Sequence, residues 1–377
     1  MKLTGMDGAD QTDFHWLETG GQALTEMLAA IMAAQHSVRL EMYLFDPSPV
    51  ADSFRNALAG ACRRGARVQV LIDAFGSMSL PDGYWEELRA AGGQIRRFNP
   101  GGFKRLGIRD HRKILVCDED LAFVGGANIA AVYHGDGVAS GWRDLGLKIR
   151  GPLARELAAA SDEMFERASL RHKPFSRLRK SAWQRTVAFA GGEILLAGPG
   201  RNNTIKLSLS RDLKHAGQVG IICAYFLPPG RILRQMARLA RRGVKVQLIL
   251  PGKSDVFLSR LAAQSFYRRL LRAGVEIYEY QPQILHAKMF LIDDIVYVGS
   301  SNLDSRSLNI NYELMLRASQ PGLAAEGRRI FSSIKDHSRR VEFGHWRRSR
   351  NFLDRIKGRL ARWVLAHLDP YVARQSS

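Results

Sequence analysis

Cysteine is scarce in this sequence, and no run of apolar residues is long enough for a membrane-spanning helix. The 377-residue chain has three cysteines, Cys62, Cys117 and Cys223, which stand far apart in apolar surroundings. Their spacing excludes a disulfide framework and predicts buried free thiols in a reducing compartment. The most apolar early segment, residues 23–34, is well short of the roughly 20 residues that a spanning helix needs. The N-terminus also lacks the charged and apolar regions of a secretory signal.

Acidic residues are also few. The sequence has 36 Asp and Glu against 56 Lys and Arg, which gives a net charge of +20. The excess is concentrated in two segments. Residues 167–185 contain seven basic and no acidic side chains, and residues 321–377 contain thirteen basic and five acidic ones, so together they carry +15. Such an excess indicates a polyanionic partner, either nucleic acid or an anionic membrane surface.

Two copies of one short pattern dominate what the sequence does contain. In both, His, Lys and Asp stand at positions i, i+2 and i+7, and a glycine-containing turn with an Asn follows. The first copy consists of His111, Lys113, Asp118, Gly126 and Asn128, and the second of His286, Lys288, Asp293, Ser300 and Asn302. The residues between Lys and Asp are apolar. Period-two spacing on an apolar run predicts a strand, with His and Lys on the same face.

The remainder of the chain repeats as well, with strands and helices alternating in both halves. We expect strands at 37–45, 67–73, 94–98, 220–226, 245–250 and 275–279, and helices at 22–36, 50–64, 84–91, 231–242 and 258–272. This repeat predicts an α/β protein of two units, each a mixed, largely parallel sheet flanked by helices, that form one pseudo-twofold active site. The expected boundaries are an extension at 1–20, units at 21–166 and 191–335, a basic linker at 167–190 and a C-terminal segment at 336–377.

A single copy of the motif is weak evidence, since one His on a strand is more often a structural residue than a catalyst. The alternative for a doubled motif is a repeat that kept the fold and lost the chemistry. That alternative predicts decay in at least one copy, whereas both copies are intact. The pair therefore indicates catalysis.

The chain resembles the phospholipase D superfamily, whose signature is a doubled His-x-Lys-x4-Asp followed by Gly-[Gly/Ser]-x-Asn. More narrowly it resembles bacterial cardiolipin synthases, over residues 20–335. The narrower resemblance rests on strings such as Glu41-Met-Tyr-Leu-Phe45, Phe123-Val-Gly-Gly-Ala-Asn128, Arg143-Asp144 and Gly299-Ser-Ser-Asn302. It implies the short form without N-terminal transmembrane helices. It also implies transfer of a phosphatidyl group from phosphatidylglycerol to a second phospholipid, with phosphatidylethanolamine as a further substrate.

The motif residues suit exchange of alcohols at a phosphodiester. One neutral imidazole can form a phosphohistidine while the second protonates the departing alkoxide. Lys113 and Lys288 supply positive charge where the phosphorane accumulates negative charge, and Asn128, Asn302 and Ser300 can donate to the same oxygens. This chemistry requires no metal or cofactor, and the sequence has no cluster with metal-ligand spacing.

The two motifs are nearly symmetric, so the residues alone do not identify the nucleophile. The resemblance implies that His111 attacks and that His286 is the general acid and then the base. Asp144 and Glu313, which lie 33 and 27 residues beyond these histidines, are candidates to orient the imidazoles. Which carboxylate serves which histidine stays open.

Asp118 and Asp293 belong to the signature but stand seven residues beyond the histidines. An extended strand of that length covers about 20 Å. We therefore expect these two carboxylates to fix a turn and not to contact substrate.

The C-terminal region predicts a basic amphipathic helix between Trp346 and Leu368 that contacts the anionic cytoplasmic face of the cell membrane. Its apolar positions are Phe352, Leu353, Ile356, Leu360, Trp363 and Val364. The alternative is a helix that packs this stripe on the protein's own core. The basic run at 167–185 is either an interdomain linker or a second surface contact.

Three classes of function fit these observations: a phosphatidyltransferase, a phospholipase D that uses water and yields phosphatidic acid, and a nuclease. The positive charge would suit DNA, but both motifs lie in one chain and the charge accompanies an amphipathic helix, so nucleic acid is disfavoured. A monomer suffices for a complete site. The choice between transfer and hydrolysis depends on water exclusion, which no motif reports.

Overall fold

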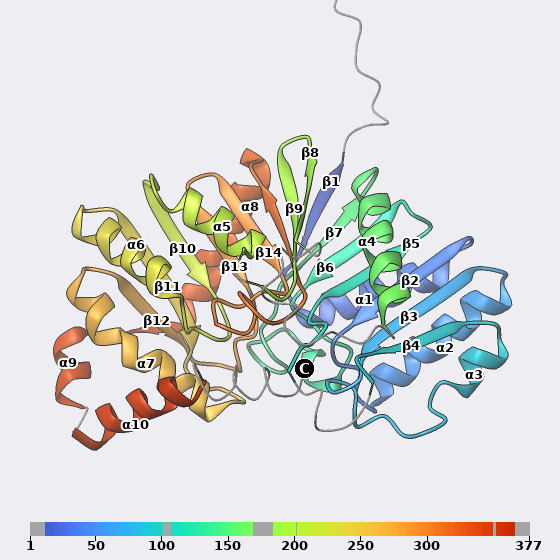
Figure 1. The fold of residues 1–377 in the computed structure, drawn as a ribbon, viewed down its shortest axis with the longest axis horizontal. Helices are drawn as coiled ribbons and strands as arrows, with labels where there is room; N and C mark the ends of the chain where they lie inside the picture. The colour runs from blue at the N-terminus through green and yellow to red at the C-terminus, as the bar shows by residue number, and fades with distance from the viewer. Residues whose placement is uncertain (1–11, 101–106, 169–183, 201, 350–351, 366–377) are drawn as a thin grey trace, which may run out of the picture.

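Two α/β halves lie side by side in the computed structural model (Figure 1). The structure describes residues 12–100, 107–168, 184–200, 202–349 and 352–365. The first half contains a seven-stranded sheet in the order β1-β7-β6-β5-β2-β3-β4, and the second a nine-stranded sheet in the order β16-β12-β11-β10-β13-β14-β15-β9-β8.

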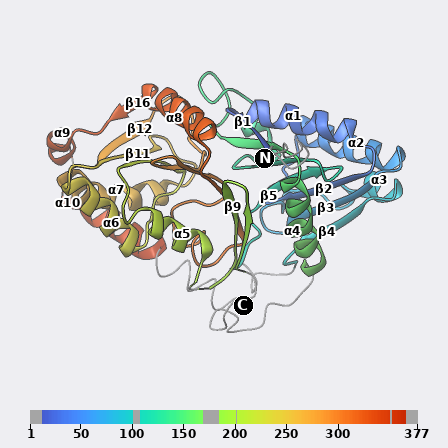
Figure 2. The same ribbon diagram turned by 90° about the horizontal axis from the view of Figure 1, so that it is seen from above.

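The first half follows the predicted alternation closely. Its elements are β1 (Asp13–Leu17), α1 (Gly20–Ala33), β2 (Ser37–Met42), α2 (Pro49–Arg63), β3 (Arg67–Asp73), α3 (Glu86–Ala90), β4 (Gln94–Phe98), β5 (Lys113–Cys117), β6 (Leu121–Gly125), η3 (Ala131–Tyr133), β7 (Gly146–Arg150) and α4 (Leu153–Arg167). Seen from above, α4 lies on one face of the sheet and α1 and α2 lie on the other (Figure 2). At the end of α2, Gly65 adopts a φ of 95°, a left-handed conformation that ends helices and favours glycine.

The second half repeats this course. Its elements are β8 (Arg185–Phe189), β9 (Gly192–Ala197), α5 (Thr204–Asp212), β10 (Gln218–Ile222), α6 (Gly230–Arg241), β11 (Lys245–Pro251), α7 (Phe257–Arg272), β12 (Glu276–Tyr280), β13 (Met289–Ile292), β14 (Ile295–Gly299), β15 (Glu313–Ala318), α8 (Pro321–Asp336), β16 (Ser338–Arg340), α9 (Phe343–Arg348) and α10 (Phe352–Trp363). Among the described helices, none combines the length and the apolar character needed to cross a membrane.

The sheets are mixed, but the prediction that they are largely parallel is wrong. Parallel pairing is confined to β2-β3-β4 and β10-β11-β12, and the other neighbours pair antiparallel. The reason lies in the motif strands, since β5 and β13 are followed by tight turns into β6 and β14. A short turn can only join antiparallel strands, because a parallel crossover needs a dozen or more residues.

The sheets also extend beyond the expected boundaries of the two units. β1, placed in the extension at 1–20, pairs with β7. β8, placed in the linker, pairs with β9, and β16, placed in the C-terminal segment, pairs with β12. Edge strands were missed because each is short and partly exposed. Most of the basic run at 167–185 lies outside the described residues.

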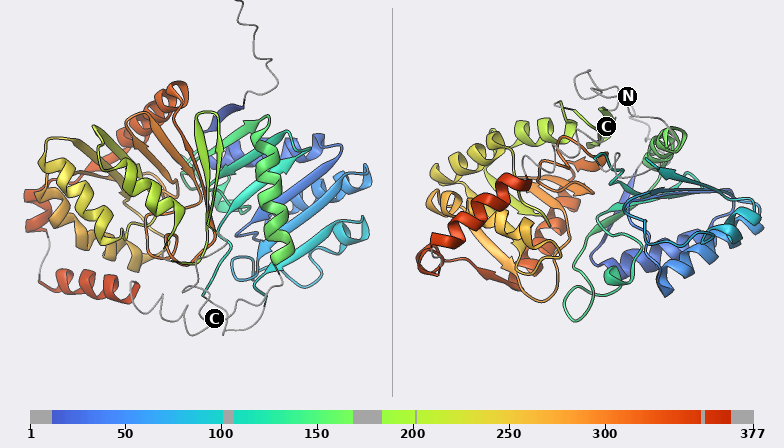
Figure 3. Two further views of the ribbon diagram at one scale, coloured as in Figure 1. Left: turned by 45° about the horizontal axis from the view of Figure 1, so that its top comes forward. Right: turned by 60° about the horizontal axis from the view of Figure 1, so that its bottom comes forward.

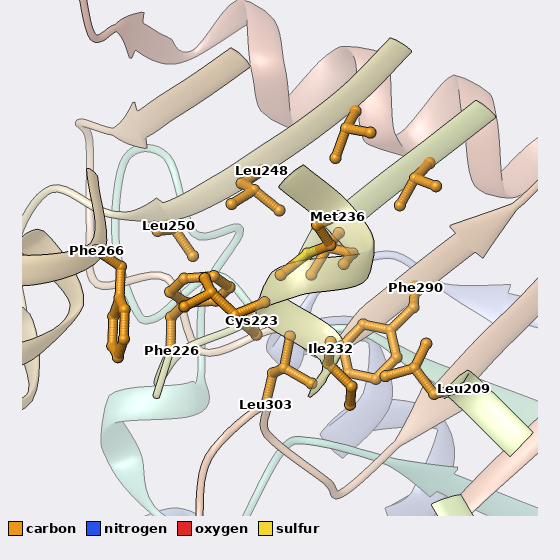
Figure 4. Packing of buried hydrophobic residues seen from close by; sticks show 14 of the residues in the cluster. Leu209, Cys223, Phe226, Ile232, Met236, Leu248, Leu250, Phe266, Phe290 and Leu303 are labelled. Atoms are coloured by element: carbon orange, nitrogen blue, oxygen red, sulfur yellow. The ribbon is translucent and has the colours of Figure 1, made fainter. Parts of the chain in front are cut away.

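Hydrophobic packing joins the halves into one body. A cluster centred on β10, β11 and helices α5 to α7 fills the second half (Figure 4). Another cluster takes residues from both halves, including Ile114, Leu147, Met289 and Val298, so the two sheets share a core. Trp16 reinforces the junction by donating its indole N–H to the Leu323 carbonyl oxygen, 3.3 Å away. Cys117 and Cys223 are buried, whereas Cys62 is only partly buried.

The signature aspartates lie at the far ends of the motif strands, in the turns β5-β6 and β13-β14. Asp118 accepts hydrogen bonds from the backbone N–H groups of Gln35, His36 and Ser37, at 2.7–2.9 Å. Its counterpart Asp293 accepts hydrogen bonds from the backbone N–H groups of Gly217 and of Gln218, the first residue of β10. Both aspartates have a φ of 53°. Each therefore connects a motif strand to the start of its neighbour, remote from the histidines.

We predict that Asp118→Ala lowers the free energy of unfolding by about 1–2 kcal/mol, because three amide donors lose their acceptor. Backbone donors hold the pKa of Asp118 below its ordinary value, although partial burial opposes them. The stabilisation should therefore be present above the unfolded pKa and disappear as the pH falls through the folded one. Thermal melting at neutral and acidic pH measures both effects. Asp120→Ala, which removes an exposed ion pair in the same turn, is the control, and an equal shift in both variants would contradict the assignment.

Candidate active site

Each motif histidine is held by the backbone of the opposite half. The N–H of His111 donates to the carbonyl of Tyr312 at 3.0 Å, and the N–H of Tyr312 donates to the carbonyl of Arg109 at 2.8 Å. On the other side the N–H of His286 donates to the carbonyl of Arg143 at 2.7 Å. These bonds form short parallel bridges between segments about 140–200 residues apart.

The bridges bring each histidine beside the carboxylate of the other half. Glu313 follows Tyr312 and lies 3.1 Å from Nδ1 of His111. Asp144 follows Arg143 and lies 2.7 Å from Nδ1 of His286. Both carboxylates are fully buried. The pairing that the sequence left open is thus crossed, and in each pair Nδ1 faces the carboxylate and leaves Nε2 for chemistry.

Two buried lysines lie beneath the histidines. Lys113 donates from Nζ to the carbonyl oxygen of His111 at 2.7 Å. Lys288 donates to the carbonyl oxygen of His286, and its Nζ is 2.6 Å from Nδ1 and 3.1 Å from Nε2 of that ring. Burial, with repulsion from Lys288, lowers the pKa of Lys113 to about 7. Two cations in a dry site favour an anionic ligand that would neutralise them.

The same environment keeps both imidazoles neutral. Burial and then the neighbouring lysines lower the pKa of His111 well below its ordinary value. Burial and Lys288 lower the pKa of His286 to about 4, although Asp144 opposes the shift. Binding of an anion would offset the lysines and raise both values.

The two carboxylates differ in charge. Burial raises the pKa of Glu313 to about 7, despite the opposing effect of Lys113. Burial alone would also raise the pKa of Asp144, but Lys288 and His286 hold it below its ordinary value. Near neutral pH, Asp144 is therefore ionised and Glu313 titrates.

One substitution between the two motifs accompanies this difference. The Ser300 hydroxyl donates to Glu313 and accepts the N–H of Leu314 at 3.0 Å. The first motif has Gly126 instead, and a Cβ there would lie 2.3 Å from Oδ1 of Asp144. Ser300 was predicted to bind the substrate phosphate, but its hydroxyl hydrogen is directed to Glu313, so we assign it to positioning that carboxylate.

A cavity of about 670 Å³ opens above the histidines. His111, His286, Asn128 and Asn302 all belong to its lining. The remaining wall combines aromatic and aliphatic side chains with polar ones, which include two arginines and two aspartates. Its residues are Tyr43, Leu44, Phe75, Arg109, Val132, Tyr133, Trp142, Tyr225, Leu227, Asp255, Val256, Ser259, Asp304, Ser305, Arg306, Ser307, Asn311 and Leu365. Within the described part of the chain, no three His, Cys, Asp or Glu side chains are grouped to hold a metal ion.

The two asparagines are fixed in equivalent ways. Oδ1 of Asn128 accepts the N–H of Leu44 at 3.2 Å, and Oδ1 of Asn302 accepts the N–H of Tyr225 at 3.3 Å. Their amide nitrogens are left to donate. Nδ2 of Asn128 donates to the Tyr133 hydroxyl at 2.8 Å, so on that side a tyrosine shares the amide with any ligand.

Sequence reasoning missed the aromatic residues around the histidines. Tyr133 and Trp142 pack against His286 with ring centroids 5.2 and 5.6 Å away, and Tyr43 packs against His111 at 4.8 Å. Tyr43 lies within a string that carried the family resemblance and Trp142 stands next to another, which was the available signal. Tyr133 ends the short helix η3 and had none.

Comparison with known proteins agrees with this geometry. The family described as "Cardiolipin synthase, PLD-like domain" matches residues 27–167 and 209–335. Cardiolipin synthase B of Salmonella typhimurium is 34% identical over 313 residues, which cover 80% of this chain and 75% of that protein. Cardiolipin synthase 1 of Bacillus cereus is 29% identical over 361 residues, 92% of this chain and 71% of that protein.

Solved structures share the fold at low sequence identity. The phosphatidylserine synthase of Haemophilus influenzae superposes with a TM-score of 0.73 at 15% identity, covering 96% of this chain and 95% of that one. The polyphosphate kinase of Porphyromonas gingivalis gives a TM-score of 0.58 over 89% of this chain. At such identity the agreement concerns the fold alone.

We predict that Gly126→Ala separates Asp144 from His286, since the new methyl group would occupy the position of the carboxylate oxygen. Loss of the hydrogen bond that holds the buried, ionised Asp144 costs about 3 kcal/mol and should lower Tm by roughly 4 °C in a chain of this length. The matched control is Gly322→Ala, where an added Cβ meets nothing within 4 Å. Equal melting temperatures for the two variants would show that Asp144 does not depend on the missing side chain.

Proposed function

The chain belongs to the cardiolipin synthases of the phospholipase D family, and from that premise we propose that it transfers a phosphatidyl group from phosphatidylglycerol to a second phospholipid and releases glycerol. The acceptor is a second phosphatidylglycerol, whose head group carries free hydroxyls. Phosphatidylethanolamine has no hydroxyl and would serve only as an alternative phosphatidyl donor, with ethanolamine as its leaving group. The observation that carries the proposal is the crossed pair of imidazoles above two buried lysines in one largely apolar cavity.

We assign the first displacement to His111. Its Nε2 forms a bond to phosphorus while the bond from phosphorus to the glycerol oxygen breaks, and His286 gives its Nε2 proton to that oxygen. In the second displacement, a hydroxyl of the acceptor lipid loses its proton to His286 and attacks phosphorus. The bond to His111 then breaks and the enzyme is restored.

The surroundings of the two histidines support this division of roles. Ionised Asp144 stabilises an imidazolium at His286, as a general acid requires, once the substrate phosphate offsets the lysines. Glu313 with its pKa near 7 leaves His111 the less basic partner and hence a neutral nucleophile. Lys113 and Lys288, with the amide groups of Asn128 and Asn302, stabilise the phosphorane.

The cavity also suits a hydroxyl-bearing head group. Oδ1 of Asn311 lines the cavity, is buried, and has no hydrogen-bond partner among the described residues. A buried acceptor without a donor is costly, and a glycerol hydroxyl would satisfy it. The aromatic wall favours a lipid acceptor over water, which supports transfer over hydrolysis.

The enzyme acts, in this proposal, as a peripheral protein on the anionic cytoplasmic face of the cell membrane. The basic C-terminal helix supports the contact through its exposed cations, Lys357, Arg359 and Arg362. Part of the predicted segment, residues 350–351 and 366–368, lies outside the described residues.

The purified protein should convert the phosphatidylglycerol of vesicles to cardiolipin and glycerol. Lipid chromatography measures the cardiolipin, and a glycerol assay measures the released alcohol. His111→Ala and His286→Ala should each lower turnover by at least about 1,000-fold, since both displacements need both rings. Phosphatidic acid as the sole product would identify a hydrolase instead. Substantial turnover by either variant would refute the paired-histidine mechanism.

We predict that Glu313, which cannot accept the Nδ1 proton of His111 when protonated, sets the acid limb of the kcat/KM profile with a pKa of about 7. Loss of the Lys113 charge, also with a pKa of about 7, sets the alkaline limb. Ser300→Ala removes a hydrogen bond that lowers the pKa of Glu313, so the acid limb of the pH profile should move to higher pH. Glu313→Gln should abolish the acid limb and lower kcat about 100-fold.

Ser301→Ala is the matched control, because that hydroxyl donates to the Asn302 carbonyl. An unmoved acid limb in Ser300→Ala would reject the role of Glu313.

A further inference from the structure

Large apolar side chains surround the mouth of the cavity and face solvent. Phe75, Val132 and Val256 line the cavity and are still 43%, 44% and 40% exposed. Met78 and Phe257 stand three and one residues beyond Phe75 and Val256 in the sequence and are 69% and 66% exposed. These five residues, the mouth rim, come from three segments that are distant in sequence: the segment after β3, the short helix η3 and the start of α7. Isolated exposed apolar residues are common, but a ring of them around a pocket marks a binding surface.

Helix α10 exposes a second apolar surface. Four of its large apolar side chains, Leu353, Ile356, Leu360 and Trp363, are exposed. These four residues, the outer stripe, recur at the spacing of one helix face. The helix instead packs on α7 through small residues, with Ala361 buried and Gly358 so close that a Cβ would lie 3.2 Å from the Leu261 carbonyl oxygen. Neither predicted alternative for this segment included docking through its small face.

The rim and the stripe adjoin one another. Leu365, just beyond α10, lines the cavity together with Val256 and Ser259 at the start of α7. Figure 3 shows α10 lying across α7, and Figure 1 places it along the lower edge of the molecule. Lys357 and Arg359, both exposed, flank the stripe. An apolar strip bordered by cations matches the boundary between acyl chains and anionic head groups.

We propose that the mouth rim and the outer stripe form one surface that inserts into the interface of an anionic bilayer and opens the cavity directly to membrane lipids. The proposal rests on the proposed function, in that the substrates are membrane phospholipids. Withdrawing a lipid with two acyl chains into water is unfavourable for every methylene exposed. A mouth embedded among head groups lets the phosphodiester reach the histidines while the chains stay in the bilayer.

The test uses the full chain with His111→Ala, so that turnover cannot alter the vesicles. Met78→Ser/Phe257→Ser removes rim contacts, and Leu353→Ser/Leu360→Ser removes stripe contacts. Both should weaken cosedimentation with phosphatidylglycerol–phosphatidylcholine vesicles about tenfold or more, because each side chain no longer enters the interface. The matched control is Met32→Ser/Leu207→Ser, which removes residues 60% and 52% exposed on α1 and α5 and should bind as the parent does.

A second readout does not depend on binding strength. An environment-sensitive fluorophore on Phe257→Cys, in a Cys62→Ser background, should shift to the blue on these vesicles, and one on Met32→Cys should not. Unchanged cosedimentation of both double variants, or equal shifts at the two labels, would overturn the proposal. So would a change in oligomeric state on light scattering without a change in vesicle binding, which would identify a protein–protein face. Absence of lipid turnover in the protein with His111 intact, with these binding results unchanged, would refute only the proposed function.

Discussion

The site depends on two backbone bridges that cross between the halves. His111 bonds to Tyr312, and His286 bonds to Arg143, so each imidazole is positioned by the chain segment that ends in its carboxylate. Because these bonds join distant segments, neither half alone can assemble a histidine–carboxylate pair. The shared hydrophobic core maintains the register of the bridges, and thus packing far from the cavity determines its chemistry.

Duplication would produce two equivalent histidines, yet the proposed mechanism needs two different ones. The structure separates them through the groups behind each imidazole and not through the imidazoles themselves. Where the first motif has Gly126, Asp144 approaches closely and takes the N–H of Leu145 directly at 2.8 Å. Where the second has Ser300, a hydroxyl stands between the equivalent N–H and Glu313. The two carboxylates nevertheless differ in protonation near neutral pH mainly because burial raises the pKa of Glu313 while Lys288 and His286 lower that of Asp144.

The sequence predicted the periodic features of the fold well and the long-range ones poorly. Strands at 67–73 and 94–98 were correct to the residue, because alternation within a strand is local. The sheets were wrongly expected to be largely parallel, since direction depends on the turns that follow each motif. The roles of Asp118 and Asp293 in those turns followed from strand length alone. The crossed pairing of Asp144 and Glu313, and the short helix that carries Tyr133, depend on contacts between halves that no local pattern encodes.

Reaction and substrate are encoded in different parts of the molecule. The lysines, the carboxylates and His286 are buried and His111 is largely so. In the proposed mechanism they would act on any phosphodiester that reached them. What reaches them is decided by the cavity wall and its mouth, where apolar side chains are exposed at a cost that only a nonaqueous partner removes. A polyanion in solution, such as nucleic acid, would complement the net charge of +20. It would still leave the apolar side chains of the mouth rim and the outer stripe exposed to water. A bilayer satisfies both, because it offers anionic head groups to the cations and acyl chains to the apolar surface.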